Sequence, residues 1–331
     1  MPGSNFLLPD LAAQLSKLIA QVPAGKVTTC GALAAALGNP VAARWIGHFL
    51  LHHAHDAACG CHRVVRAGGV LGPYVDGDLA AKRRRLQAEA VEVQHDMVDL
   101  ARYGHDGFQS DRSLDRLRQI QEQIAARVVL RRPRHVPRTV GGVDVSYLPP
   151  EEGVAAYTLV ELATGQLLWS QTIRRTIRFP YITSYLTFRE LPILLELLDE
   201  VRAAGRLAPL LLVDGSGILH PRHAGIATHL GVAAKLPTIG VTKKLLCGQV
   251  DLDDLPPRQS RPVVYQDRLI GVALRPTAGS RRPIFVSPGH RVDVSFAAQM
   301  VHELLVGHRL PEPLYWADRL SHAAARAATP H

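Results

Sequence analysis

The second half of the chain shows a run of strand patterns followed by alternating strand and helix patterns. Residues 140–147 (VGGVDVSY) alternate apolar and polar positions with the period of a strand. The expected elements are, in order, strands at 140–147, 153–162 and 166–177, a helix at 183–205, a strand at 210–215, a helix at 222–236 and a strand at 237–243. This order predicts an α/β domain with a mixed sheet, in which ligands collect at the carboxyl ends of strands.

The first half of the chain has mainly helical spacing. Residues 11–22 and 29–37 are expected as helices, and GNP at 38–40 supplies a tight turn before a further helix. Asn39 is an N-cap candidate, and proline follows it at the first helical position. This arrangement is typical of a helix-turn-helix, although other helical hairpins share it. The expected organisation is a helical domain at 1–98, a linker at 99–111 and an α/β domain at 112–331.

The net charge indicates which class of molecule the protein binds. The chain has 38 Lys and Arg against 29 Asp and Glu, a formal net charge of +9. A protein this basic favours nucleic acid, and anionic membrane surfaces come second. The four cysteines do not form a disulfide framework, and no apolar stretch reaches the roughly 20 residues that cross a bilayer. With no signal-peptide pattern at the start, we expect a soluble, cytoplasmic protein that binds nucleic acid and not membranes.

Three carboxylates of the α/β domain are candidates for a metal site. Asp144 lies within a strand, Asp214 ends another strand, and Glu190 precedes the apolar run of a helix. Converging carboxylates repel one another unless a cation is present, and oxygen ligation suits Mg²⁺ or Mn²⁺. Gly215 and Gly217 would then let a substrate approach the backbone closely. Each acid taken alone is more simply explained as a cap or a turn former.

Six motifs occur in the order found in endonuclease V, the deoxyinosine-directed repair nuclease. They are GVDVSY, FPYITSYLTFRE, LLLVDGSGILHPRHAGIATHLGV, PTIGVTKKLLCG, PIFVSPGHRV and RLPEPLYWADRL. The resemblance covers residues 110–322 and implies a ribonuclease-H-like fold. It also implies a metal-dependent endonuclease that uses Mg²⁺, for which Mn²⁺ can substitute.

This resemblance assigns roles to individual residues. Asp144, Glu190 and Asp214 correspond to the metal-binding carboxylates. His290 matches the family histidine near the metal and the attacking water, and its alternative is a loop histidine capping a turn. Lys243 matches a lysine near the scissile phosphate, and its alternative is an ordinary surface lysine.

The stretch FPYIT at 179–183 resembles the segment with which the family separates DNA strands. A rigid tip can fill the gap left when a base leaves the duplex. Tyr181, between Pro180 and Ile182, is the candidate wedge. Thr183 stands where the family often has proline, so the tip is expected to be less rigid.

The reaction implied by the resemblance is hydrolysis of the second phosphodiester bond 3′ to deoxyinosine. The products carry 3′-hydroxyl and 5′-phosphate ends, and the substrate is double- or single-stranded DNA. Two alternatives stay open. One is a nuclease acting on inosine in RNA, and the other is a damage-binding protein without catalysis.

The first half contains a second chemical stretch, ACGCHRV at 58–64. Its cysteines and histidine lack a second ligand pair at usable spacing, so a structural zinc site is not expected. Cys59 is expected to be an inert thiol. Cys61 has a histidine and basic residues beside it, conditions that can make a thiol nucleophilic.

Residues 5–92 resemble the DNA-binding domain of alkylguanine-DNA alkyltransferases, on the stretches GKVTTCGALAAALGNPVAARWIGHFL and CHRVVRAGGVLGPY. The resemblance makes Cys61 the alkyl acceptor, His62 its base and Glu89 the residue that orients His62. Arg44 matches the arginine that fills the duplex after the nucleotide rotates out, and its alternative is a phosphate contact.

The chain departs from this family at three positions, Gly60, Cys30 and His53, where the family has proline, tyrosine and asparagine. Two interpretations therefore remain for the N-terminal domain. It either transfers the alkyl group or only binds O6-alkylguanine in DNA.

Overall fold

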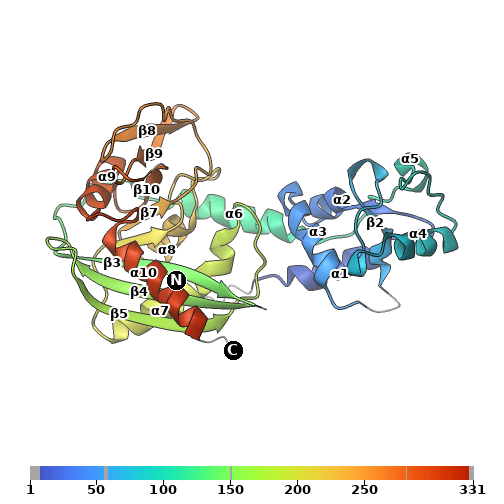
Figure 1. Ribbon diagram of the computed structural model, residues 1–331, viewed down its shortest axis with the longest axis horizontal. Helices are drawn as coiled ribbons and strands as arrows, with labels where there is room; N and C mark the ends of the chain where they lie inside the picture. The colour runs from blue at the N-terminus through green and yellow to red at the C-terminus, as the bar shows by residue number, and fades with distance from the viewer. Residues whose placement is uncertain (1–7, 56–58, 150, 281, 328–331) are drawn as a thin grey trace. The chain divides into compact units, whose positions relative to one another are not determined.

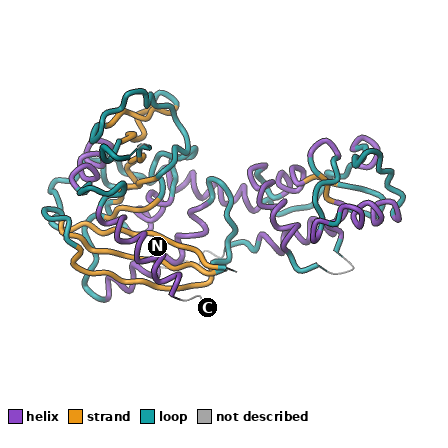
Figure 2. Tube along the Cα trace, viewed as in Figure 1, coloured by secondary structure: helices purple, strands orange, loops and turns teal. Residues whose placement is uncertain are grey.

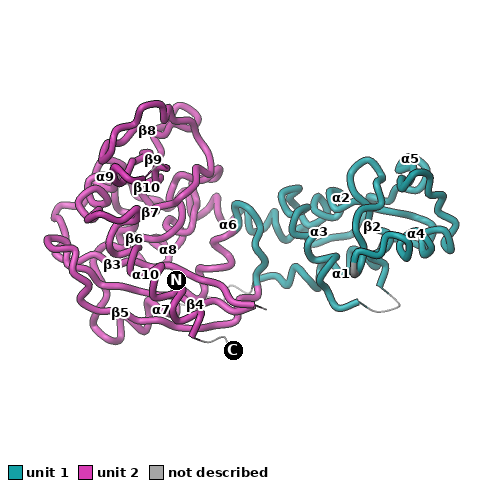
Figure 3. The backbone as a smooth tube through the Cα atoms, in the orientation of Figure 1, with its two compact units in different colours: residues 1–119, 179–185 teal, residues 120–178, 186–331 magenta. Residues whose placement is uncertain are grey.

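A computed structural model of the chain describes residues 8–55, 59–149, 151–280 and 282–327, and within these ranges the strands of the second half pair into one eight-stranded sheet (Figure 1). The chain divides into two units (Figure 3). Unit 1 comprises residues 1–119 and 179–185, and unit 2 comprises residues 120–178 and 186–331. Helices and loops predominate in unit 1, whereas unit 2 contains the large sheet (Figure 2).

The sheet of unit 2 has the order β5-β4-β3-β6-β7-β10-β9-β8. Its strands are β3 (Thr139–Leu148), β4 (Glu152–Glu161), β5 (Leu167–Thr176), β6 (Leu211–Asp214), β7 (Thr238–Thr242), β8 (Ser260–Tyr265), β9 (Arg268–Leu274) and β10 (Ile284–His290). β3, β6 and β7 are parallel neighbours, and the other pairs are antiparallel. The expected mixed sheet is therefore confirmed, and β8 to β10 extend it.

Helices cover both faces of this sheet. They are α7 (Leu186–Ala203), α8 (Ile226–Ala234), α9 (Val294–Glu303) and α10 (Glu312–Ala327). Strand β6 shows why the sheet is buried on both sides, since Leu212 packs in a core with α9 and α10 while Leu211 and Val213 pack with α7 and α8. Burying each such side chain stabilises the fold by about 1.5–3 kcal/mol. This central position fixes the residues at the end of β6.

Unit 1 is built from short helices around a two-stranded parallel sheet. Its elements are α1 (Leu11–Ala20), β1 (Thr28–Thr29), α2 (Cys30–Ala36), η1 (Pro40–Ala42), α3 (Ala43–His52), η2 (Gly60–Arg63), β2 (Val64–Val65), η3 (Ala67–Gly69), η4 (Val75–Gly77), α4 (Leu79–Ala88) and α5 (Leu100–Tyr103). Between α2 and α3, Gly38 has a φ of +105°, and the Asn39 side chain accepts a hydrogen bond from Val41 N. The GNP turn thus separates two helices as the helix-turn-helix pattern predicts.

The expected linker at 99–111 is hydrogen-bonded to unit 1. Val27 N donates to Tyr103 O at 2.8 Å, and His105 N donates to Val27 O at the same distance. Gln21 also exchanges two hydrogen bonds with the backbone of Gln109. The division between the units falls instead inside α6 (Ser113–Ala125). Tyr103 and Leu100 of this segment also pack in the core of unit 1 with Val27, so the segment is part of that unit although it shows no hydrophobic period.

No helix within the described part of the chain is both long and apolar enough to cross a lipid bilayer.

Candidate active site

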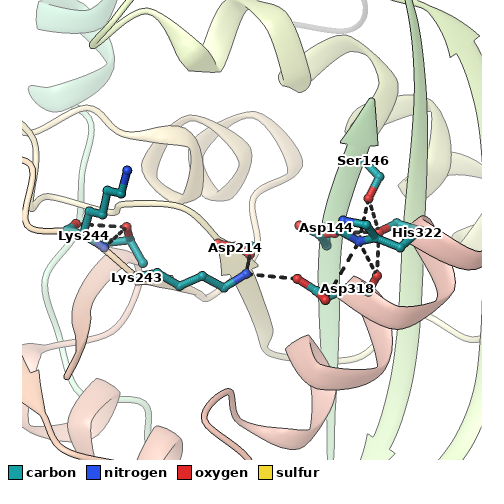
Figure 4. Close-up of polar contacts among 9 residues, drawn as sticks. Asp144, Ser146, Asp214, Lys243, Lys244, Asp318 and His322 are labelled. Carbon is teal, nitrogen blue, oxygen red and sulfur yellow. Dashed lines mark hydrogen bonds and ion pairs between the residues drawn. The ribbon is translucent and has the colours of Figure 1, made fainter. Parts of the chain in front are cut away.

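Asp144 and Asp214 lie on adjacent parallel strands. The register of β3 and β6 pairs Val143 with Val213, so the next position on each strand is an aspartate. Side chains alternate between the faces of a strand, and Val143 accordingly packs in the core with α7 and α8. Asp144 instead points to the face that α10 covers, where it meets α10 side chains (Figure 4). The strand pairing thus brings together two carboxylates that are 70 residues apart in the sequence.

Glu190 is the third carboxylate, and it enters from the first part of α7. It is only 7% exposed, and Tyr147 Oη donates a hydrogen bond to its Oε1. Burial, together with the charges of Asp144 and Asp214, raises the pKa of Glu190 to about 8 against the opposing effect of the Tyr147 hydrogen bond. The three acids expected from the sequence therefore interact electrostatically.

The pKa values of Asp144 and Asp214 are raised in the same way, by burial and by neighbouring negative charges. Burial raises the pKa of Asp214 to about 6, and the neighbouring Asp144 adds to this rise. The pKa of Asp144 is also raised, by burial first, even though Ser321 donates a hydrogen bond to it. Buried carboxylates that repel one another are stabilised as anions by a cation. Their oxygen atoms are the ligands that hard divalent cations prefer.

Helix α10 adds three polar residues that the sequence analysis did not assign. Ser321 Oγ donates to Asp144 Oδ2 at 2.7 Å, and Ser146 Oγ lies 3.0 Å from His322 Nδ1 (Figure 4). Possible ligand atoms of Asp144, Asp318 and His322 all lie within 4.8 Å of one another. Asp318, Ser321 and His322 stand at i, i+3 and i+4 of the helix and so share one face. Asp318 lies in the motif RLPEPLYWADRL, and Ser321 and His322 follow that motif directly, so this spacing was the available signal.

Lys243 follows β7 and lies between two acids. Its Nζ is 3.3 Å from Asp214 Oδ2 and 3.0 Å from Asp318 Oδ1 (Figure 4). Burial alone would lower the pKa of Lys243, but Asp214 and Asp318 outweigh this effect and raise it. The lysine is therefore a cation held at the carboxyl ends of β6 and β7, the edge where α/β sheets bind ligands.

His290 is not brought to the carboxylates. It pairs with Thr238 at the start of β7, whereas Asp214 pairs with Val241. Three residues of strand separate these levels by about 10 Å. The ring of His290 is buried, and its Nδ1 accepts a hydrogen bond from Val129 N at 3.4 Å. His290 thus ends strand β10 and contacts the segment at Val129, and it neither lies near the carboxylates nor occupies a loop.

The two glycines after Asp214 are in close contact with protein atoms. A Cβ at Gly215 would lie 2.2 Å from Ile226 Cγ2, and a Cβ at Gly217 would lie 2.1 Å from Pro288 O. Gly215 also has a φ of +148°. Packing thus requires glycine at both positions, and at Gly215 the backbone conformation requires it as well, which is a different reason from the expected approach of a substrate.

The segment 179–185 presents one aromatic side chain to solvent. Tyr181 is 62% exposed, while Phe179 and Ile182 are each 2% exposed. Pro180 is half-buried, and Thr183 is exposed. The segment belongs to unit 1, in which Asn39 Nδ2 donates to Tyr185 Oη at 2.9 Å. Buried residues on both sides therefore fix the base of the exposed tyrosine.

In unit 1, His62 and Glu89 form the expected pair. His62 Nε2 lies 2.9 Å from Glu89 Oε1, and Arg63 binds the same carboxylate through two nitrogens. Burial lowers the pKa of His62, although Glu89 opposes this effect. Glu89 therefore orients the imidazole as the sequence analysis expects. Arg44 is exposed on α3.

Cys61 contacts other partners. It is 3% exposed, and its Sγ lies 3.3 Å from His55 Nδ1. Burial raises the pKa of Cys61 to about 12, and the neighbouring Cys59 adds to this rise. Within the described residues, no hydrogen bond joins Cys61 to His62. The expected thiol–imidazole pair with His62 is thus not formed.

Known proteins resemble both parts of the chain. Residues 122–319 match the family described as Endonuclease V, and residues 10–91 match the 6-O-methylguanine DNA methyltransferase, DNA binding domain. A protein of Picrophilus torridus named Bifunctional methyltransferase/endonuclease is 32% identical over 299 residues, which cover 90% of this chain and 92% of that protein.

Two solved structures resemble about two thirds of the chain. Human endonuclease V is 32% identical with a TM-score of 0.61, and the match covers 65% of this chain and 99% of that chain. Endonuclease V of Ciona intestinalis, solved in complex with a 24mer DNA containing an inosine followed by a ribo-adenosine, is 25% identical with a TM-score of 0.61. That match covers 66% of this chain and 100% of the other.

Proposed function

Because the chain belongs to the endonuclease V family of DNA repair nucleases and carries an N-terminal alkylguanine-binding domain, we propose that it hydrolyses the second phosphodiester bond 3′ to deoxyinosine. The products would carry 3′-hydroxyl and 5′-phosphate ends. The observation that carries this proposal is the pair Asp144 and Asp214 at adjacent positions of parallel strands. We assign the nuclease to residues 112–331 and the alkylguanine-binding domain to residues 1–98, ranges that contain the two family matches.

The proposed cofactor is Mg²⁺, for which Mn²⁺ would substitute. The donor set supports it, because Glu190 and Asp214 are carboxylates whose pKa values are raised by burial and by the charge of neighbouring acids, and a divalent cation would offset this repulsion. Asp144, Asp214 and Glu190 would hold the ion, and Asp318 would add a negative charge beside them. A magnesium ion bound there supplies an activated water and a contact for a phosphoryl oxygen.

The side chains around this position have separate tasks. Ser321 donates to Asp144 and so orients its carboxylate. The Lys243 ammonium is placed to stabilise the negative charge that develops on the phosphate. Tyr181, fixed between Pro180 and Ile182, would occupy the space left by a displaced base. His290 takes no part in this proposal, because it lies near the amino end of β7.

The test is strand nicking of an end-labelled duplex that carries a single deoxyinosine. We expect cleavage one nucleotide beyond the inosine with Mg²⁺ and none with EDTA or with a matched adenosine duplex. Asp214→Asn keeps the shape of the side chain and removes its charge, and should lower the rate by about 10³-fold or more. Nicking at the wild-type rate by this variant would refute the assignment of Asp214.

Two further measurements test whether the nuclease also cleaves RNA and whether the N-terminal domain transfers an alkyl group. The same assay with an inosine-containing RNA of matched sequence tests the alternative substrate. Incubation with DNA labelled on the O6-methyl group of guanine tests alkyl transfer, since label found on Cys61 would establish it. Binding without transfer of the label would leave unit 1 as a recognition domain.

A further inference from the structure

Four side chains of unit 1 converge outside the nuclease site. His53 and His55 follow α3, and Cys59 and Cys61 lie at the start of η2. One possible ligand atom from each lies within 4.8 Å of every other. His53 Nε2 is 3.1 Å from Cys59 Sγ, and His55 Nδ1 is 3.3 Å from Cys61 Sγ. We propose that these four side chains bind one zinc ion.

The distances match a tetrahedral site. Zinc bonds are about 2.3 Å to sulfur and about 2.0 Å to nitrogen, so neighbouring ligand atoms lie about 3.5 Å apart. The two nitrogen–sulfur separations of 3.1 and 3.3 Å fall slightly below this value, and the four ligand atoms all lie within 4.8 Å of one another. Small side-chain rotations would therefore complete the coordination without movement of α3 or η2.

The outer nitrogens of both histidines already have partners. His53 Nδ1 lies 3.2 Å from Phe49 O, and His55 Nε2 lies 3.1 Å from Tyr74 Oη. Metal-binding histidines characteristically donate their second nitrogen to such an oxygen, which fixes the ring and leaves the first nitrogen free for the metal. Tyr74 is in turn contacted by Arg85 Nη1 at 3.2 Å. The surroundings therefore present the nitrogens of both rings toward the sulfur atoms.

The donor atoms select the metal. Two thiolates and two imidazoles are the ligands of structural zinc sites, whereas magnesium prefers the oxygen atoms of the nuclease site. On binding, each cysteine thiol releases its proton to solvent and forms a sulfur–zinc bond. The four ligands fill the tetrahedron, so Cys61 is held as a metal ligand and not as a free thiol.

This proposal differs from the expectation, drawn from the sequence, that residues 58–64 do not form a structural zinc site. In the sequence, His62 stands beside Cys59 and Cys61, but its ring is turned to Glu89. The second ligand pair is His53 and His55, on the other side of residues 56–58, giving H-x-H-x₃-C-x-C. The site does not depend on the nuclease activity, and it can be tested separately.

Cobalt titration of the reduced, metal-free full-length chain tests the site. Cobalt bound by thiolates gives a sulfur-to-metal charge-transfer absorption that oxygen ligands do not give. Cobalt bound by the carboxylates of the nuclease site would therefore not contribute to this absorption. We expect this absorption to saturate at a single equivalent and to disappear when zinc is added. An absence of the absorption in the reduced wild-type protein would overturn the proposal.

Variants assign the ligands. Cys59→Ser should remove about half of the absorption, because one of two thiolates remains. The double variant Cys59→Ser with Cys61→Ser should remove all of it. Cys247→Ser is the matched control, since Cys247 lies in unit 2 and outside the cluster. Retention of the absorption in the double variant, or its loss in the control, would exclude this assignment.

A second measurement uses only the wild-type chain, so it does not depend on variants that fold. Iodoacetamide labelling with and without zinc, followed by peptide mass spectrometry, reports each thiol. We expect zinc to slow the labelling of Cys59 and Cys61 at least tenfold and to leave Cys247 unchanged. Labelling of Cys59 and Cys61 at the same rate with and without zinc would contradict zinc binding.

Discussion

At the scale of single residues, Asp318 connects the parts of the nuclease site. It accepts a hydrogen bond from Lys243 and lies close to Asp144, so it influences both the cation and the carboxylate. Groups in such positions typically change metal affinity or activity by about 10–100-fold when they are altered. The residue therefore belongs to the site even though its contact with Lys243 is partly exposed.

We predict that Asp318→Asn slows nicking by about 10–100-fold and raises the Mg²⁺ concentration needed for half-maximal rate. The reason is the loss of one negative charge beside the metal-binding carboxylates. The measurement is the nicking rate as a function of Mg²⁺ concentration. Asp267→Asn, in the exposed turn between β8 and β9, is the control and should change neither quantity. An unchanged magnesium dependence in Asp318→Asn would remove the residue from the site.

His229 is a single buried residue that affects the folding stability of the protein. It is 2% exposed in α8, packs against the Phe188 ring, and its Nε2 has no hydrogen-bond partner among the described residues. Burial lowers its pKa to about 3, and His220 and Arg222 add to this effect. The folded protein therefore keeps His229 neutral between pH 3 and pH 6.5, while the unfolded chain binds a proton.

We predict that this histidine makes the protein less stable as pH falls below about 6.5, by up to about 1.4 kcal/mol per pH unit. His229→Leu should therefore lose less stability between pH 7 and pH 5 than the wild-type protein. Denaturant unfolding at both pH values measures the difference. His135→Leu alters an exposed histidine and should keep the wild-type pH dependence. The same loss in both variants would show that His229 is not responsible.

At the scale of elements, α10 positions one side of the site by packing on β3. The contact is close at Gly142, where a Cβ would lie 2.3 Å from Pro313 O and 2.4 Å from its carbonyl carbon. Thr158 Oγ1 on the neighbouring β4 donates to the same Pro313 O at 2.7 Å. A side chain at Gly142 must therefore move the start of the helix that carries Asp318 and Ser321.

We predict that Gly142→Ala destabilises unit 2 by about 1–3 kcal/mol. It should also reduce nicking by about 10²-fold, since a displacement of about 1 Å is enough for such a loss. Thermal unfolding and nicking at a temperature where the variant is folded separate the two effects. Gly279→Ala is the control, because a Cβ there meets only Thr277 Oγ1 at 4.0 Å. Full activity of Gly142→Ala would show that α10 does not set the geometry.

At the scale of the whole molecule, the two units contain different sets of candidate functional side chains. Unit 2 contains the carboxylates and Lys243, and unit 1 contains Arg44 and the pair His62 and Glu89. The net charge of +9 favours DNA binding by the chain in general, and lesion recognition depends on individual side chains.

We predict that substitutions at Arg44 and at Asp214 separate the two functions. Arg44→Ala should weaken binding to an O6-methylguanine duplex by about 1–3 kcal/mol and leave inosine nicking unchanged. Asp214→Asn should abolish nicking and keep the wild-type affinity for the O6-methylguanine duplex. Fluorescence anisotropy at fixed salt and the nicking assay measure these effects. Slower nicking by Arg44→Ala would reveal that the units act on one lesion together.

The sequence alone determined the class of fold and most of the acidic residues of the site. Strand periodicity placed the side chains of Asp144 and Val143 on opposite faces of one strand, and the apolar run before Asp214 predicted a buried strand. Both features could be predicted because side-chain alternation and burial are local properties of the chain. The GNP turn was equally readable, since Asn39 and Gly38 satisfy local backbone requirements. Ordered motifs then indicated the family.

Tertiary structure decided which side chains meet. Asp318 joins Asp144 only because α10 packs on β3, and His290 lies apart because the register of β10 sets it at the other end of β7. In unit 1, the fold turns His62 to Glu89 and gathers His53 and His55 around the two cysteines. Such contacts depend on strand register, helix packing and loop closure, which act over distances in sequence that no local pattern records.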